Sequence, residues 1–250
     1  MKTFFNLSLT FFALVFLMNA NAQTSPSPIK SATFDWKVSR NGELKYLLYL
    51  PPGYDPSGNK RWPLMLFLHG SGERGTDVQR VAVHGPLSLV KQGTNFPFII
   101  VAPQCPNEQI WKNEPLLQLL DQTEKAYAVD TRRVYLTGLS MGGYGTWALG
   151  LAHPERFAAL VPICGGGNMI DVVLGPRDKP DEFKRLPIWA FHGAKDDVVP
   201  VSESERMVGQ LQKLGVKNVK LTIYPEANHN SWTETYKNPE VYEWLLKQSR

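Results

Sequence analysis

The amino-acid sequence predicts an α/β fold in which a mostly parallel central sheet carries helices on both faces. Two observations lead to it: short, uninterrupted apolar runs recur along the chain, and helix-compatible stretches separate several of them. Runs bounded by turn residues are typical of parallel strands buried on both faces, and strands alternating with helices assemble into such a sheet. An apolar fraction of 43% and seven Trp indicate a globular core, not a disordered chain.

Six apolar runs are the expected parallel strands. They lie within residues 63–68, 98–102, 133–137, 157–163, 188–192 and 219–224. The expected helices cover residues 115–129, 142–151, 202–214 and 239–247. Ahead of them, residues 33–50 alternate apolar and polar side chains around a turn at Asn41-Gly42, which predicts a hairpin. This hairpin would form the antiparallel edge that mixed sheets often carry.

The first 22 residues have the pattern of a secretory signal peptide. Lys2 gives a positive start, residues 4–17 are mostly apolar, and Ala20-Asn21-Ala22 fits a cleavage site. A membrane anchor is the alternative, but polar residues interrupt the run, which falls short of the roughly 20 apolar residues that a span needs. We therefore expect export to the periplasm or the medium, with no stable membrane insertion after cleavage. Residues 23–31, rich in Ser and Pro, predict a flexible lead-in, and residues 32–250 predict a single domain.

The charge pattern gives no sign of nucleic-acid binding. The formal net charge is +4, and the basic residues are spread along the chain without a run of like charges.

The two cysteines, Cys105 and Cys164, invite a disulfide in an exported protein. Each follows a different expected strand, however, and those strands should lie about three positions apart at about 4.8 Å per strand. That separation exceeds the roughly 7 Å between Cα atoms that a bridge allows. We expect no disulfide unless the loops converge.

The strongest local motif is Gly138-Leu139-Ser140-Met141-Gly142, which fits the pattern G-x-S-x-G. It lies between an expected strand and an expected helix, the context that a nucleophile elbow requires. The turn is too tight for side chains beside the serine, so glycine is needed at both flanks. It lifts the Ser140 hydroxyl above the sheet and points the N-terminus of the helix at a developing oxyanion. Ser140 is the expected nucleophile, and a simple glycine turn is the alternative.

A serine hydroxyl needs a base to become a nucleophile, and histidine is the usual one. Of the five histidines, His69 and His192 end strands before a glycine, so we expect them to shape loops. His84 and His153 have no acidic partner suggested by spacing. Enzymes with a serine on this kind of turn carry the acid and then the histidine later in the chain. Only His229 leaves room for an acid in between, so it is the expected base.

The acid should follow the expected strand 188–192, where the segment HGAKDDVVP supplies Asp196 and Asp197. An acid in this position holds the imidazole tautomer and stabilises the imidazolium. The other interpretation of either residue is an exposed turn residue or the cap of the next helix. We expect one of the two to have that role.

The loop after the first buried strand, HGSGERG, should complete the oxyanion hole. The expected donors are the backbone N–H groups of Met141 and Ser71, with that of Gly72 as the alternative to Ser71. The same loop formally matches the dinucleotide-binding pattern G-x-G-x-x-G, but residues 90–97 hold no acid to bind a ribose. HExxH, CxxC and Walker patterns are absent from the sequence, so neither a cofactor nor a metal is predicted.

With these residues identified, the chain resembles the α/β-hydrolase superfamily. It looks closest to small secreted esterases related to prolyl-oligopeptidase-like and to feruloyl and acetylxylan esterase-like proteins, often labelled carboxylesterase or predicted peptidase. The resemblance covers most of residues 46–244. Its carriers are Pro51-Pro52-Gly53-Tyr54, LHGSGERG, Val101-Ala102-Pro103-Gln104-Cys105, VDTRRVYLTGLSMGG, HGAKDDVVP and Asn228-His229.

The resemblance implies that residues 32–250 form an α/β-hydrolase catalytic domain, and it assigns the acid to Asp196 in preference to Asp197. The sequence departs from the pattern at Asn228, where many relatives have Gly before the catalytic histidine. Because Asn tolerates a left-handed backbone, this departure is compatible with the assignment of His229.

The segment between the expected strands that end at Ile163 and begin at Ile188 has about two dozen residues, too few for a substantial cap domain. We therefore expect an open cleft, which suits bulky or polymer-borne esters. Trp111 and Trp232 are candidates to line the acyl or sugar side, with ordinary packing as the alternative. Arg74 is a candidate to meet a carboxylate or a sugar hydroxyl, with a surface salt bridge as the alternative.

The expected activity is that of a serine carboxylesterase, in which His229 takes the Ser140 proton, an acyl-enzyme forms and water releases the acid. Polysaccharide-linked feruloyl or acetyl esters are suggested by analogy, and small-molecule esters are the other option. A prolyl-oligopeptidase-type peptidase is an alternative, although the sequence given predicts no separate gating domain. A non-catalytic carbohydrate-binding protein on this fold is a third, but its mark would be a missing triad member. The sequence predicts no oligomeric state.

Overall fold

A computed structural model describes residues 42–175 and 178–250 of the chain. The predicted signal peptide, the predicted lead-in and the first strand of the predicted hairpin lie outside the described residues. Residues Gly42–Arg250 form one compact unit.

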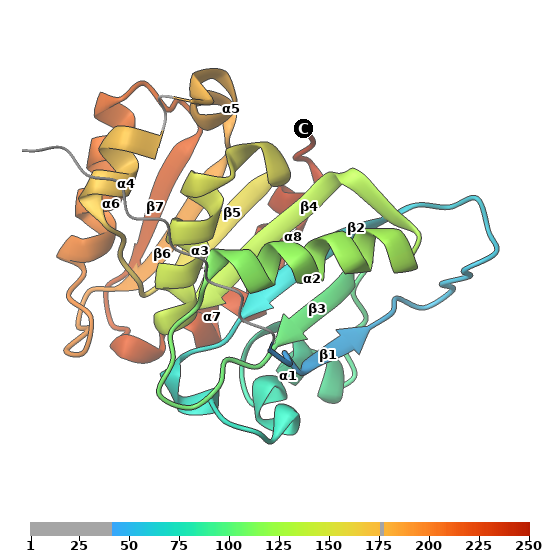
Figure 1. The fold of residues 1–250 in the computed structure, drawn as a ribbon. Helices are drawn as coiled ribbons and strands as arrows, with labels where there is room; N and C mark the ends of the chain where they lie inside the picture. Colours follow the sequence, from blue (N-terminus) through green and yellow to red (C-terminus); the bar gives the residue numbers. More distant parts are fainter. Residues whose placement is uncertain (1–41, 176–177) are drawn as a thin grey trace, which may run out of the picture. The chain divides into compact units, whose positions relative to one another are not determined.

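In the described residues, seven strands form one sheet in the order β1-β3-β2-β4-β5-β6-β7 (Figure 1). β1 pairs antiparallel with β3, and every other neighbouring pair is parallel. The strands are β1 (Tyr46–Tyr49), β2 (Trp62–Leu68), β3 (Ile99–Pro103), β4 (Val129–Leu139), β5 (Ala159–Ile163), β6 (Ile188–Gly193) and β7 (Val219–Tyr224). The predicted α/β fold, with a mostly parallel sheet and an antiparallel edge, is confirmed.

Helices cover both faces of this sheet (Figure 1). On one face lie α2 (Asn113–Ala126), α3 (Met141–Ala152), α4 (Met169–Leu174), α5 (Pro180–Arg185) and α6 (Ser202–Lys213), which share one core cluster. On the other face lie α1 (Gly85–Lys91), α7 (Trp232–Lys237) and α8 (Pro239–Leu246), which share a second cluster. Short 3-10 turns are η1 (Ser71–Glu73), η2 (Val78–Ala82), η3 (Pro154–Arg156) and η5 (His229–Ser231).

Strand β2 illustrates why an uninterrupted apolar run folds in this way. Leu64, Leu66 and Leu68 point into the first core cluster, whereas Met65 and Phe67 point into the second. Since successive side chains of a strand alternate between faces, a strand covered on both sides needs apolar residues at every position. Each of these buried side chains contributes about 1.5–3 kcal/mol to stability.

One predicted helix boundary is wrong. The helix expected over residues 115–129 ends at Ala126, and Val129 already begins β4. Tyr127 has an extended backbone with φ −125° and ψ 160°, and the Ala128 carbonyl accepts a hydrogen bond from the Trp62 N–H at 2.8 Å. Pairing with β2 therefore draws these residues into the sheet earlier than their apolar pattern indicates.

The cysteines and the segment between β5 and β6 follow expectation. Cys105 and Cys164 are free and buried, and they follow β3 and β5, which stand three positions apart in the sheet. Between β5 and β6 the described residues form only the short helices α4 and α5, with no cap domain among them. None of the helices described in the structure has the length and apolar character needed to cross a membrane.

Candidate active site

Ser140 stands on the turn between β4 and α3, and its backbone is strained. Its φ of 52° and ψ of −117° lie in a region that residues other than glycine rarely occupy, at a cost of about 1–3 kcal/mol. The flanking glycines are required by space: a Cβ at Gly142 would collide with the carbonyl oxygen of Leu68, and one at Gly138 with that of Gly142. The motif thus forms the strand–turn–helix connection expected from the sequence.

Contacts from β5 hold this strained turn in place. The Ser140 N–H donates to the Ile163 carbonyl oxygen at 3.0 Å and lies 3.3 Å from the Cys164 Sγ atom. Met141 is the first residue of α3, where backbone N–H groups have no partner within the helix. The N–H of Met141 is therefore one of the orphan donors next to the Ser140 hydroxyl.

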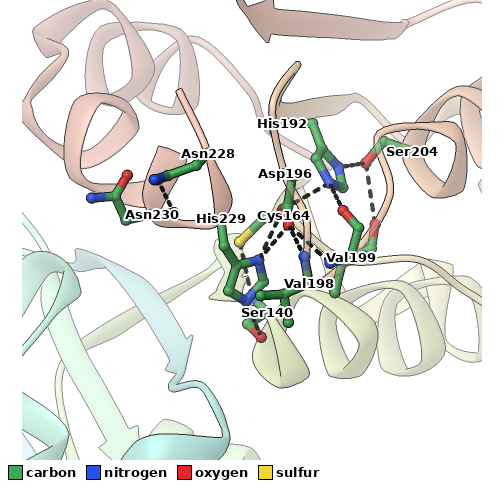
Figure 2. Close-up of polar contacts among 11 residues, drawn as sticks. Ser140, Cys164, His192, Asp196, Val198, Val199, Ser204, Asn228, His229 and Asn230 are labelled. Carbon is green, nitrogen blue, oxygen red and sulfur yellow. Dashed lines mark hydrogen bonds and ion pairs between the residues drawn. The ribbon is translucent and has the colours of Figure 1, made fainter. Parts of the chain in front are cut away.

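Ser140, His229 and Asp196 meet in one chain of hydrogen bonds (Figure 2). The His229 Nε2 atom is 3.0 Å from Ser140 Oγ, and His229 Nδ1 is 2.8 Å and 3.0 Å from the two carboxylate oxygens of Asp196. Because Nδ1 faces only acceptors, it carries the ring proton, which leaves the Nε2 lone pair free to accept the Ser140 hydroxyl proton. Asp197 is exposed, so of the two candidate acids Asp196 is the one that meets His229.

The Asp196 carboxylate is buried and held in its ionised form. Its side chain is 0% exposed, and burial by itself would raise the pKa of Asp196. Hydrogen bonds from His229 and from the backbone N–H groups of Val199 and Val198 outweigh that effect and keep the pKa of Asp196 below its ordinary value. The carboxylate therefore carries its charge at neutral pH and stabilises a proton on His229.

The loops that carry the acid and the histidine are joined to each other. They follow the neighbouring strands β6 and β7, and the Lys195 N–H donates to the Ala227 carbonyl oxygen at 2.9 Å. Gly193 permits this approach, since a Cβ there would collide with the carbonyl oxygens of Ala227 and Asn228. Asn228 has φ −91°, so the position before His229 does not require a left-handed backbone. Its side chain caps η5 by accepting from the Asn230 N–H at 3.4 Å.

The loop after β2 approaches Ser140. β2 and β4 are neighbours, with Leu68 paired to Gly138, so their carboxyl ends lie side by side. A Cβ built on Gly70 would be 3.6 Å from the Cβ of Ser140. Ser71, whose backbone N–H was predicted as the second oxyanion donor, directly follows Gly70 and opens η1.

Two side chains brace this loop. The Glu73 carboxylate accepts a hydrogen bond from the Gly70 N–H at 3.0 Å, and the Arg80 guanidinium donates to the Gly72 carbonyl oxygen at 2.6 Å. Sequence reasoning assigned no role to Glu73 or Arg80, since the one signal for Glu73 was its position in the motif LHGSGERG. The bracing matters because an oxyanion donor acts through a fixed position.

His69 is a buried structural residue at the base of the loop. Its Nδ1–H donates to the Gly70 carbonyl oxygen at 2.6 Å, and its Nε2 accepts from the Cys105 N–H at 2.9 Å. Burial lowers the pKa of His69 to about 4, and the positive charges of Arg74 and Arg80 add to the effect. The neutral form of the His69 ring agrees with these contacts, because a second proton, on Nε2, would point at the Cys105 N–H.

Trp111 and Arg74, predicted to bind substrate, make contacts within the protein. The Trp111 Nε1–H donates to the His69 carbonyl oxygen at 3.1 Å, and its ring stands edge-on to the His69 ring at 4.8 Å. Arg74 donates to the carbonyl oxygens of Ser71 at 3.0 Å and Gln109 at 3.2 Å. Among the described residues Arg74 forms no ion pair. Through these hydrogen bonds both side chains support the loops beside Ser140.

Trp232 borders the histidine of the site. Its ring stands edge-on to the His229 ring at 5.3 Å and lies 5.4 Å from the ring of His84. His84, which sequence spacing left without an acidic neighbour, has its Nε2 atom 3.9 Å from the Glu73 carboxylate. Trp232 and His84 thus connect His229 to the loop after β2.

One group among the described residues has the makeup of a metal site: Cys164, Asp196 and His229 have ligand atoms within 4.8 Å of one another. Burial raises the pKa of the Cys164 thiol to about 12, so it keeps its proton at neutral pH. The Nδ1 atom of His229 is engaged by Asp196. These contacts favour hydrogen-bonded chemistry over metal ligation at this group.

Comparison with protein families shows the family to which this chain belongs. Residues 38–206, more than half of the chain, match the family described as "Putative esterase", and residues 176–249 match the prolyl oligopeptidase family. The chain belongs to the esterase family. The resemblance to α/β-hydrolase serine esterases is thereby confirmed.

Individual proteins that are similar to this esterase-family chain are also described as esterases. It is 28% identical over 182 residues to the bifunctional acetylxylan esterase/xylanase of Neocallimastix patriciarum, covering 68% of this chain and 24% of that protein. It is 26% identical over 238 residues to the probable feruloyl esterase C of Aspergillus niger, and the match covers 90% of this chain and 82% of that protein. A solved thermostable esterase is 35% identical with a TM-score of 0.69, covering 83% of this chain and 60% of that one. The chain thus spans about a quarter of the first relative's length.

Proposed function

We propose that this esterase-family chain hydrolyses carboxylic esters with Ser140 as nucleophile and His229 as general base. The ionised Asp196 carboxylate is the third member of the triad and orients His229. One observation carries the proposal: a continuous hydrogen-bond chain links Ser140 Oγ, both ring nitrogens of His229 and the buried Asp196 carboxylate. A strained serine at the start of a helix adds support, since such strain is typical of functional positions.

The proposed reaction has two matching halves. As Ser140 Oγ attacks the carbonyl carbon, His229 Nε2 takes the hydroxyl proton and then gives it to the departing alcohol, which leaves the acyl group esterified to Ser140. A water molecule then loses a proton to His229 and attacks the acyl-enzyme; His229 returns that proton to Ser140 Oγ as the bond to the acyl group breaks, which frees the acid and restores the Ser140 hydroxyl. In both halves Asp196 stabilises the imidazolium.

For the negative oxygen of each tetrahedral intermediate we propose the backbone N–H groups of Met141 and Ser71, with that of Gly72 as the alternative to Ser71. Support comes from the position of Met141 at the first turn of α3 and from the proximity of Gly70 to Ser140. Donors fixed in advance in this way contribute about 2.7–4 kcal/mol each to the lowering of the barrier.

We propose feruloyl or acetyl esters, carried on polysaccharides or on small molecules, as the substrate class. The names of the fungal relatives support it, and so does the segment between β5 and β6, whose described residues form two helices of six residues each and no cap domain. Trp232 is the proposed contact for an aromatic acyl group because it borders His229. Trp111 and Arg74 are proposed to act on substrate mainly through the loops that they support.

A peptidase is the second candidate function, and the match of residues 176–249 to the prolyl oligopeptidase family favours it. The same triad would then attack an amide carbonyl. The other alternative, a non-catalytic carbohydrate-binding protein, is disfavoured by the assembled hydrogen-bond chain.

The test compares the purified protein with Ser140→Ala on 4-nitrophenyl acetate, butyrate and octanoate, methyl ferulate, acetylated xylan and a chromogenic prolyl peptide. We expect ester hydrolysis in the parent and a loss of about 10³-fold or more in the variant. The preferred substrate separates the feruloyl, acetyl and general esterase functions, and faster peptide cleavage would favour the peptidase. Undiminished activity in Ser140→Ala would remove Ser140 as the nucleophile.

We further propose that residues 1–22 direct export and are then removed, on the basis of the positive start, the apolar run and the Ala20-Asn21-Ala22 motif. The N-terminal sequence of the protein recovered from a secreting host should begin at Gln23. Recovery of an intact N-terminus from the membrane fraction would instead indicate an anchor.

A further inference from the structure

A second histidine lies behind the acid of the proposed triad (Figure 2). The His192 Nε2 atom is 3.2 Å from Asp196 Oδ2, the same oxygen that lies 2.8 Å from His229 Nδ1. The side chains of His192 and Asp196 are both 0% exposed. Figure 2 shows Asp196 between the two imidazole rings. The carboxylate is therefore contacted by one ring that can reach substrate and by one that cannot.

The partners of His192 place a proton on its Nε2 atom. Its Nε2 atom faces two acceptors, the Asp196 carboxylate at 3.2 Å and the Val199 carbonyl oxygen at 2.8 Å. A bare lone pair there would oppose both acceptors at a buried position, so Nε2 carries a proton that the two oxygens share. On the far side of the ring, Nδ1 is 2.7 Å from the Ser204 hydroxyl, which anchors the ring to α6.

His192 also reaches the carboxylate by a second route. The Val199 residue whose carbonyl oxygen accepts from His192 donates its own N–H to Asp196 Oδ1 at 2.8 Å. His192 thus holds one carboxylate oxygen directly and steadies the donor to the other. Without His192, the backbone N–H groups of Val198 and Val199 would still bind Oδ1, but Oδ2 would lose its contact on the side away from His229.

We propose that His192 is a positioning residue, which orients Asp196 so that the carboxylate keeps the His229 proton on Nδ1 and the Nε2 lone pair directed at Ser140. This inference rests on the proposed function. Because His192 is buried beneath Asp196, it acts on turnover and not on substrate binding. A misplacement of about 1 Å at a catalytic group costs up to about 10²-fold in rate, which sets the size of the expected effect.

The test is a double-mutant cycle between His192 and Asp196, measured as kcat and KM on 4-nitrophenyl acetate. In the parent background, His192→Leu is expected to lower kcat by about 10–100-fold with little change in KM. His192→Gln, whose amide N–H reaches the same two acceptors, should restore most of the loss. In the Asp196→Ala background, whose residual activity comes from binding and the oxyanion donors, His192→Leu should have almost no further effect.

Each outcome discriminates. An equal fold-loss in both backgrounds would assign His192 to general stability, and an unchanged kcat in His192→Leu would assign it to core packing; both overturn the inference. If His192→Leu fails to fold by circular dichroism, His192→Asn, whose amide is too short to reach Asp196, replaces it in the cycle. Ser140→Ala is measured alongside: if that variant keeps its activity, the proposed function itself fails, independently of His192.

Discussion

At the scale of single residues, the neighbouring Asp196 and Asp197 allow a test with a built-in control, because only Asp196 contacts His229. Asp196→Asn is expected to lower kcat by about 10⁴-fold, because an amide at this position favours the wrong tautomer of the catalytic histidine. Asp197→Asn, at an exposed position, is expected to leave kcat unchanged. Steady-state kinetics on one activated ester measure both. Similar losses in the two variants would contradict the assignment of the acid.

His69 predicts how stability depends on pH. Its pKa is about 4 in the folded protein, against an ordinary value of 6.5, so the unfolded chain binds its proton first as the pH falls. Stability should therefore decrease as the pH falls from 6.5 to 4 and be constant with respect to this group above 6.5. At about 1.4 kcal/mol per pKa unit, the loss is about 3 kcal/mol.

Urea unfolding of the parent and of His69→Gln at several pH values between 4 and 7.5 checks this effect. The variant should be less stable at pH 7 and should lack His69's share of the acid-side decrease. Parallel pH dependences in the two proteins would show that His69 titrates normally.

Sequence reasoning found the three residues of the hydrogen-bond chain because each belongs to a motif with a defined place on the fold. It missed Glu73 and the contacts of His192 because their partners come from turns whose geometry no spacing reveals. His192 bonds to the Val199 carbonyl oxygen and the Ser204 hydroxyl, groups that carry no sequence signal. The capping role of Asn228 also went unpredicted: its side chain caps a turn while its backbone stays at negative φ.

At the scale of elements, the elbow between β4 and α3 depends on close backbone contact. Gly142→Ala should destabilise the protein by about 1–3 kcal/mol and lower activity, because its Cβ would meet the Leu68 carbonyl oxygen, which is backbone and cannot move aside cheaply. Gly209→Ala in α6 is the matched control. A Cβ there meets nothing within 4 Å, and the change should stabilise the helix by up to about 1 kcal/mol.

Thermal unfolding and ester hydrolysis, measured on Gly142→Ala and Gly209→Ala, test whether the elbow needs glycine at position 142. If Gly142→Ala is as stable and as active as Gly209→Ala, the elbow does not require the close approach of β2.

The central strands were predictable because a sheet covered on both faces demands apolar runs, and β2, β3, β5 and β6 are buried at every position. The edge strand β7 mixes apolar residues with Lys220 and Thr222, and its prediction came from a less regular run. Helix boundaries were less predictable from the sequence. The end of α2 is decided by the pairing of β4 with β2, and not by the apolar periodicity of α2. Short helices such as α4 and α5, of six residues each, give too few turns for a periodic pattern to appear.

At the scale of the whole molecule, the sheet order keeps the two cysteines apart and both thiols are buried. Dithiothreitol should therefore leave Tm unchanged, and both thiols should react with Ellman's reagent only after unfolding. Burial also raises the pKa of Cys105 and of Cys164, which slows reaction of any thiol that becomes accessible. A fall of Tm under reducing conditions would indicate a bridge and contradict the separation of the strands.

Covalent labelling of the nucleophile tests the central claim most directly. The protein is treated with a fluorophosphonate, digested and analysed by mass spectrometry, with Ser140→Ala and Ser71→Ala as parallel samples. We predict one adduct, on the peptide that contains Ser140, with loss of esterase activity in step with labelling, retained labelling in Ser71→Ala and none in Ser140→Ala. An adduct on another residue, or full activity in fully labelled protein, would contradict the account.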